Sequence, residues 1–113
     1  MRIGCPKEIK NHEYRVGLTP ASVREFVSRG HEVLVQGGAG AGVGMDDPHY
    51  ATAGATLVKD AAEIFAKADM IVKVKEPQPQ ECAMLREGQI LYTYLHLAPD
   101  PAQTAALVKS GAI

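Results

Sequence analysis

The segment Met70 to Asp100 constrains the fold most, because it has the pattern of one complete βαβ unit. Apolar runs predict strands at Met70–Val74 and Ile90–Tyr94, and prolines mark a helix that runs from Pro77 to about Arg86, with Gly88 as its stop. A helical crossover of this length joins parallel strands. Both strands therefore end at the same edge of the sheet, where open α/β sheets bind their ligands.

The rest of the chain continues the alternation of strands and helices. Further strands are predicted at 2–5, 33–35 and 56–58, and further helices are opened by Thr19-Pro20, Asp47-Pro48, Asp60 and Asp100. The last two residues, Ala112 and Ile113, have the character of another strand. This order predicts an α/β domain with a mostly parallel, Rossmann-like (flavodoxin-like) sheet and helices on both faces. A strand that only begins at the end of the sequence predicts that the domain is incomplete, or truncated.

Composition limits the classes of partner. The 113 residues suit one domain, and 12 basic against 13 acidic residues without a block of like charge give no sign of a nucleic-acid or membrane partner. No run resembles a signal peptide or a membrane span, so we expect a cytoplasmic protein. Cys5 and Cys82 lie far apart without a metal-ligand pattern, which predicts two reduced cysteines and no metal site.

A glycine-rich loop, 37–44, follows the predicted strand 33–35 and suggests a dinucleotide site at first sight. Its glycines do not meet the G-x-G-x-x-G spacing: a start at Gly37 fails at once, and the third glycine position falls on Val43 from Gly38 and on Met45 from Gly40. We therefore interpret it as a flexible surface loop and assign no cofactor-binding residue to it.

Three cationic or titratable side chains would share the carboxyl edge of this sheet. Arg15 lies in the long loop after the first strand, and Lys75 and His96 follow the two strands of the βαβ unit. Arginine can hold a carboxylate in a bidentate manner, lysine can polarise a carbonyl oxygen and histidine can move protons near neutral pH, so the set suits a small 2-oxo acid. The alternatives are a solvated arginine, a lysine at a sheet edge and a hydrogen-bonded core histidine. Lys73 adds a complication, because strand alternation puts it on the same face as Lys75.

Several separated motifs resemble one known family. They are the opening M-R-I-G-C-P-K-E-I-K-N-H-E-Y-R-V-G-L-T-P, then R-G-H-E-V-L-V-Q-G-G-A-G, K-V-K-E-P and L-Y-T-Y-L-H-L-A. In this order they resemble the amino-terminal portion of bacterial alanine dehydrogenases, within the alanine dehydrogenase/pyridine nucleotide transhydrogenase family. The resemblance implies the substrate domain of a homohexameric enzyme that converts L-alanine to pyruvate and ammonia with NAD. It also implies that the NAD-binding domain lies outside residues 1–113, so that these residues alone are inactive.

The resemblance implies roles for individual residues. Arg15 would bind the substrate carboxylate, Lys75 would contact the oxygen atoms of pyruvate and take part in catalysis, and His96 would act as the catalytic acid/base. Glu76 would help orient Lys75, and Tyr94 would pack against the substrate or the nicotinamide.

Two other functions remain open from the sequence. One is the amino-terminal domain of a proton-translocating NAD(P) transhydrogenase alpha subunit, which shares the early R-V-x-L-T-P pattern; His96 favours the dehydrogenase. The other is a non-catalytic module that binds oxo acids or joins an assembly.

Overall fold

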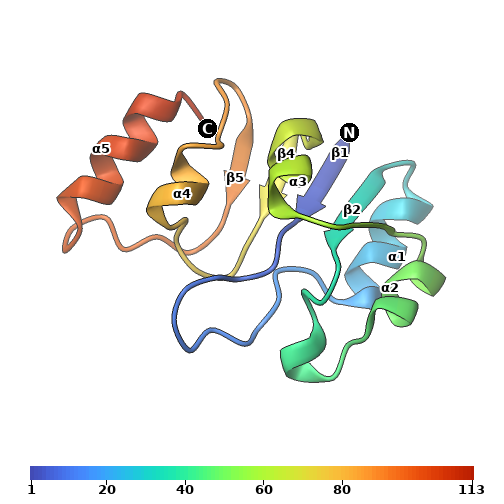
Figure 1. Cartoon of the computed structure of the whole chain (residues 1–113). Coiled ribbons are helices and arrows are strands. Elements are labelled where there is room, and N and C mark those ends of the chain that lie inside the picture. The colour runs from blue at the N-terminus through green and yellow to red at the C-terminus, as the bar shows by residue number, and fades with distance from the viewer.

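A five-stranded parallel sheet forms the centre of the computed structural model, which describes residues 1–113 (Figure 1). The strands are β1 (Arg2–Cys5), β2 (Glu32–Gln36), β3 (Thr56–Val58), β4 (Met70–Val72) and β5 (Ile90–Tyr92). The helices are α1 (Pro20–Ser28), the 3-10 turn η1 (Ala41–Val43), α2 (Asp47–Ala53), α3 (Ala61–Lys67), α4 (Pro79–Cys82) and α5 (Pro101–Ser110).

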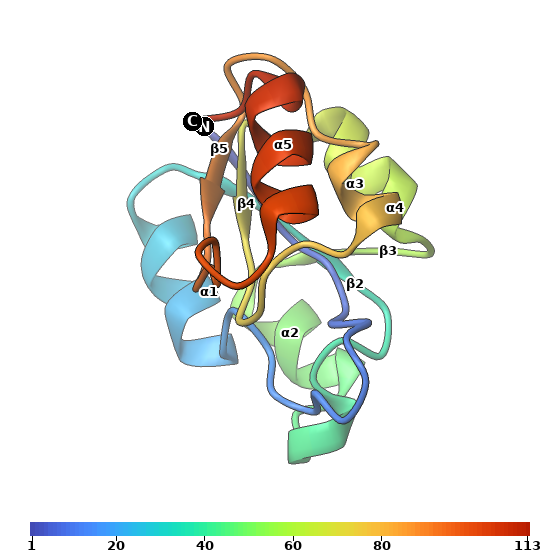
Figure 2. The same cartoon turned by 90° about the vertical axis from the view of Figure 1, so that its left-hand side faces the viewer.

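The strand order β3-β2-β1-β4-β5 places β1 in the middle, with every neighbouring pair parallel. The predicted α/β class and parallel sheet are confirmed, and of the two common doubly wound orders this is the Rossmann one. The chain winds outward from β1 to β3, then returns to β4, so helices cover both faces. α1 and α2 pack in one core cluster, and α3 and α5 in the other. Figure 2 shows α1 on one side of the strands and α3 and α4 on the other. The reversal opens a ligand crevice beside the carboxyl ends of β1 and β4.

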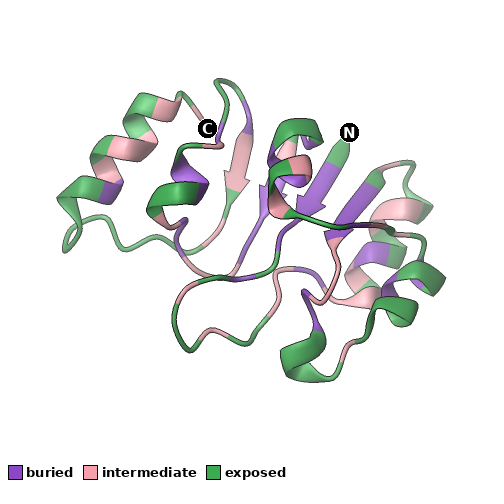
Figure 3. Cartoon of the chain, in the orientation of Figure 1, coloured by how far each residue is buried: buried purple, intermediate pink, exposed green.

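The core has two parts, one on each face of the sheet, and strand alternation separates them. Val33 and Val35 of β2 pack with α1 and α2, whereas Leu34 between them packs with Ile64 and Phe65 of α3. Burial is concentrated in β1, β2 and the helix faces that cover them, as Figure 3 shows.

The helix starts agree with the capping signals in the sequence. The N-cap side chains of Thr19, Asp60 and Asp100 accept hydrogen bonds from the backbone N–H three residues later, at 3.2, 3.0 and 3.0 Å. Cys5 and Cys82 are free and buried, as predicted.

The two strands of the βαβ unit are shorter than predicted. β4 ends at Val72 and β5 at Tyr92, two residues before the predicted ends at Val74 and Tyr94. The reason is the neighbouring strand: β1 leaves the sheet at Pro6, so the backbone beyond Val72 has no strand partner on that side. Regular pairing with β5 also stops here, although Lys73 still donates its N–H to the carbonyl of Tyr92 at 3.0 Å.

The end of the unit also differs from its prediction in detail. α4 stops at Cys82 instead of Arg86, because hydrogen bonds from Met84 and Leu85 reach back only three residues. Ile113 donates to the carbonyl of Gln89 and accepts from the N–H of Leu91, both at 2.8 Å. These bonds have the parallel pattern of a strand beside β5, in agreement with the prediction for the last two residues.

Candidate functional site

The loops that follow β1, β2, β4 and β5 meet at the carboxyl edge of the sheet, below the strand arrows in Figure 1. The long loop after β1 carries Arg15, the backbone after β4 carries Lys75, and the backbone after β5 carries His96. A cavity of ≈ 380 Å³ lies between residues 7–15 of the first loop and residues 38–42 of the glycine loop. The parallel sheet therefore places the loops that carry these residues at one edge. Arg15 lines the cavity, and Lys75 and His96 do not.

Arg15 is held by a carboxylate from its own loop. Its Nε donates to Glu13 Oε2 at 2.9 Å and its Nη2 donates to Glu13 Oε1 at 2.8 Å, which is a bidentate pair. The guanidinium of Arg15 lowers the pKa of Glu13 from 4.5 to about 2, and the charge of Lys75 acts in the same direction. Nη1 of Arg15 makes no hydrogen bond within the chain, and the side chain is 60% exposed. One edge of the guanidinium is thus fixed and the other remains available to an anion.

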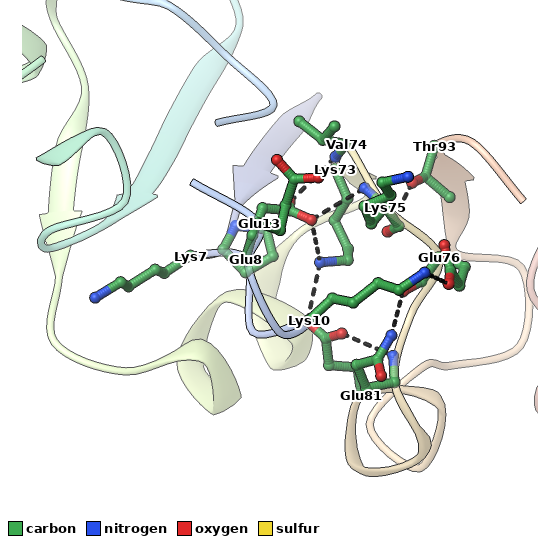
Figure 4. Close-up of polar contacts among 12 residues, drawn as sticks. Lys7, Glu8, Lys10, Glu13, Lys73, Val74, Lys75, Glu76, Glu81 and Thr93 are labelled. Atoms are coloured by element: carbon green, nitrogen blue, oxygen red, sulfur yellow. Dashed lines mark hydrogen bonds and ion pairs between the residues drawn. The ribbon is translucent and has the colours of Figure 1, made fainter. Parts of the chain in front are cut away.

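Lys75 is held through its backbone. Its N–H donates to Glu8 Oε1 at 3.0 Å, and its carbonyl accepts from the hydroxyl of Thr93 at 3.0 Å (Figure 4). Its ammonium makes no hydrogen bond or ion pair with another residue. Lys75 therefore combines a fixed backbone with an amine that is free to contact a ligand.

Lys73 does not share the exposed position of Lys75. Its side chain is 1% exposed, and its ammonium lies 3.2 Å from Glu8 Oε1 and 3.1 Å from Glu81 Oε2 (Figure 4). Strand alternation predicts that Lys73 shares a face with Lys75 and could compete with it for a ligand. The structure removes this possibility, because Lys73 is enclosed between two buried carboxylates and is not available to the cavity.

His96 is paired with Glu76. Its Nδ1 lies 3.1 Å from Glu76 Oε2, and Lys10 forms an ion pair with the other oxygen of Glu76 (Figure 4 shows the Lys10 contact). Burial alone would raise the pKa of Glu76, but hydrogen bonds from Lys10, the backbone and His96 outweigh it and lower the pKa to about 2. An anionic partner at Nδ1 favours the tautomer in which Nδ1–H donates to Glu76 and Nε2 is left to exchange protons.

Glu76 is predicted to help orient Lys75, but the hydrogen bonds of its carboxylate go to other residues. Its carboxylate contacts Lys10 and His96, and no hydrogen bond joins it to Lys75. The reason is the early end of β4: beyond Val72 the chain turns, so Glu76 faces the loop after β1 and the loop after β5.

Tyr94 lies 73% exposed at this edge. Arg15, Lys75 and His96 make no hydrogen bond with one another. Each has a carboxylate partner of its own: Glu13 for the guanidinium of Arg15, Glu8 for the backbone N–H of Lys75, and Glu76 for Nδ1 of His96.

The glycine loop is part of the site instead of a free surface loop. A Cβ at Gly42 would lie 2.8 Å from the carbonyl oxygen of Tyr14, and one at Gly40 would lie 2.5 Å from the carbonyl oxygen of Met45 and 2.8 Å from the Tyr50 hydroxyl. The glycines are therefore used for close approach to the neighbouring loop and to α2. This use of the glycines differs from that in a G-x-G-x-x-G turn, where they let the backbone approach a pyrophosphate.

Sequence reasoning missed three residues of this network, namely Glu8, Lys10 and Glu13. Acidic and basic residues in a polar loop are ordinarily solvated, so their types alone carried no signal. Glu8 is 6% exposed, and only the fold shows that burial. No group of three or more His, Cys, Asp or Glu side chains is arranged to hold a metal ion.

Comparison with known proteins gives the family. The family model described as alanine dehydrogenase/PNT, N-terminal domain, matches residues 4–113. The chain belongs to this family. No helix in it is both long and apolar enough to cross a membrane.

Individual members of the family agree closely in sequence and structure. The chain is 54% identical over 112 residues to an alanine dehydrogenase of Halomonas elongata and 53% identical over 111 residues to one of Mycobacterium tuberculosis, covering 99% and 98% of this chain and 30% of each relative. A solved L-alanine dehydrogenase superposes with a TM-score of 0.96 at 47% identity, covering 99% of this chain and 31% of that one. A transhydrogenase from Sinorhizobium meliloti gives a TM-score of 0.91 at 29% identity, covering 99% and 33%. The chain thus spans about 30% of the length of the curated relatives it matches.

Proposed function

We propose that residues 1–113 are the amino-terminal substrate domain of an NAD-dependent L-alanine dehydrogenase, which interconverts L-alanine with pyruvate and ammonia. The observation that carries the proposal is the gathering of Arg15, Lys75 and His96 at one sheet edge, each beside a carboxylate that fixes it. Relatives named alanine dehydrogenase, at about half identity across this whole segment, support the same assignment.

Substrate binding follows from the two cations. The free edge of the Arg15 guanidinium would hold the substrate carboxylate in a bidentate manner. The unpaired ammonium of Lys75 would contact the carboxylate or the carbonyl oxygen of pyruvate, where it stabilises the negative charge that develops when ammonia attacks the carbonyl carbon. Tyr94 would cover the bound substrate from the β5 side.

Proton transfer would fall to His96. In the direction of amination, addition of ammonia to pyruvate gives a carbinolamine, and loss of its hydroxyl as water gives the imine. Nε2 of His96 would give the departing hydroxyl its proton and take one back in the reverse direction, while Glu76 at Nδ1 holds the ring in place. NAD supplies the hydride chemistry when it is bound.

The glycine loop does not fit a nucleotide, so we assign NAD to a separate domain that follows these residues. The length of the relatives supports this arrangement. We also propose a cytoplasmic homohexamer, as the family resemblance implies. The intact mass of the protein purified from its source cells tests the arrangement directly. A mass of about three times that of 113 residues is expected for two domains of usual size. A mass equal to that of residues 1–113 would leave only a binding or assembly role.

Two substitutions in the full-length protein test the site. His96→Ala is expected to remove most turnover, and Lys75→Ala to raise KM for pyruvate and lower kcat together, because Lys75 would act in both binding and catalysis. His31→Ala and Lys67→Ala are matched controls, since both residues lie away from the carboxyl edge. Near-normal rates in both site variants would disprove the site assignment.

The transhydrogenase likeness supports a second candidate, the amino-terminal domain of a transhydrogenase alpha subunit. It predicts NAD(H) binding without NADH formation from alanine. An alanine-dependent NADH assay of the purified protein separates the two candidates.

A further inference from the structure

The side chain of Glu8 binds the backbone that follows β4. β1 pairs with β4 only as far as Gly4 opposite Ile71 and ends at Cys5. Beyond β4 the N–H groups of Val74 and Lys75 donate to Glu8, at 3.1 Å to Oε2 and 3.0 Å to Oε1. A backbone N–H without a partner is costly away from water, and here one carboxylate satisfies two consecutive N–H groups.

The opposite side of this backbone is also held. Lys73 donates its N–H to the carbonyl of Tyr92, and the Thr93 hydroxyl donates to the carbonyl of Lys75, both at 3.0 Å. The backbone of Lys75 is therefore fixed between the β5 side and Glu8, while its ammonium has no partner in the chain.

The charge of Glu8 has its own support. Lys73 Nζ lies between Glu8 and Glu81, and all three side chains are no more than 2% exposed. A buried carboxylate without a cation is strongly unfavourable, so Lys73 allows Glu8 to remain in place as an acceptor. Figure 4 shows this arrangement, with Lys73 reaching Glu8 on one side and Glu81 on the other.

We propose that Glu8 is a positioning residue for catalysis, which acts by fixing the backbone from which Lys75 reaches the substrate. This inference rests on the function proposed above, because it requires Lys75 to contact pyruvate. A glutamine cannot replace Glu8 fully: its single oxygen would have to serve three donors, and its amide group would face one of them.

The test uses the full-length enzyme with Glu8→Gln and Glu81→Gln as a matched pair. Both variants remove one carboxylate from Lys73, but only Glu8 bonds the backbone of Val74 and Lys75. We expect Glu8→Gln to lower kcat/KM for pyruvate by about 10-fold or more, since small misplacements of a catalytic group have effects of this order. Glu81→Gln should stay within about 3-fold, and KM for NADH should be unchanged in both. Equal losses in the two variants would overturn the inference.

A double-mutant cycle with Lys75→Ala distinguishes positioning of Lys75 from a general structural role of Glu8, because it measures whether the two substitutions affect kcat/KM independently. If Glu8 acts through Lys75, adding Glu8→Gln to Lys75→Ala causes no further loss of kcat/KM. Where turnover is too slow to measure, the affinity of the enzyme–NADH complex for pyruvate is compared instead and should show no further loss. Independent, multiplying losses would overturn the inference. Near-normal activity of Lys75→Ala itself would instead refute the proposed function, so the two failures are distinguishable.

Two further measurements cover poor folding and specificity. If Glu8→Gln does not fold, Glu8→Asp enters the same cycle, because it keeps the carboxylate but shortens its reach by one methylene. Glu32→Gln, on the exposed amino end of β2, is the control and should leave the kinetics unchanged. A crystal structure of the Glu8 variant is expected to show a displaced Lys75 backbone, and an unchanged Lys75 together with reduced activity would contradict the mechanism.

Discussion

Replacing Gly42 by alanine tests how the glycine loop supports the site. A Cβ at this position would lie 2.8 Å from the carbonyl oxygen of Tyr14 and 3.0 Å from its Cβ. Ordinary contacts of carbon atoms are near 3.5 Å, so the two loops would have to separate by roughly half an ångström or more. Because Tyr14 directly precedes Arg15, the shift would pass to the guanidinium that we assign to the substrate carboxylate.

The size of the effect follows from that displacement. A misplacement of about 1 Å can cost about 100-fold in rate, so we expect Gly42→Ala to lower kcat/KM for pyruvate by about 10-fold. The loss should appear mainly in KM, since we assign Arg15 to substrate binding, and KM for NADH should change little. Steady-state kinetics of the full-length enzyme in the amination direction measures both constants.

Gly44→Ala is the matched control in the same loop. No atom lies within 4 Å of a Cβ at Gly44, but its φ of +76° is left-handed. We expect it to lose about 1 kcal/mol of stability from backbone strain, without a shift of Tyr14. If Gly42→Ala leaves kcat/KM within 2-fold of the parent, or if Gly44→Ala lowers it equally, the glycine loop does not position Arg15 and the reasoning is refuted.

The remaining predictions concern stability. The pKa values of Glu13 and Glu76 are lowered from 4.5 to about 2, so their ionised forms favour the folded state above about pH 4.5, and this contribution should be lost as the pH falls toward 2. Melting temperatures measured between pH 2 and 7 should show the Glu76→Gln variant less stable than the parent at neutral pH and equal to it near pH 2. A difference in melting temperature that stays constant across this range would contradict the lowered pKa of Glu76. Gly4→Ala should destabilise the protein by about 1–3 kcal/mol, because its Cβ would lie 2.5 Å from Ile64 Cγ2 and overpack β1 against α3. Urea denaturation measures this change, with Gly37→Ala, whose Cβ would meet atoms only at 3.4 Å or more, as the nearly neutral control.

Much of the fold was predictable because its signals are local. The N-cap at Thr19 lies within three residues of its partner Ser22, and the apolar run of β2 alternates between the two faces within a single strand. Parallel strands joined by helical crossovers end at one edge, so Arg15, Lys75 and His96 could be assigned to that edge without coordinates. The sequence by itself therefore determined the fold class and the sheet edge at which these residues lie.

Only the tertiary structure decided which charges meet. Glu8 bonds the backbone of Lys75 across 67 positions of sequence, and Lys10 pairs with Glu76 across 66. No local periodicity relates residues so far apart, because their contact depends on where β1 leaves the sheet and how its loop crosses β4. The same departure of β1 shortened β4 and turned Glu76 toward His96. Secondary structure follows from near neighbours in the chain, whereas the pairing of buried charges follows from the position of whole strands.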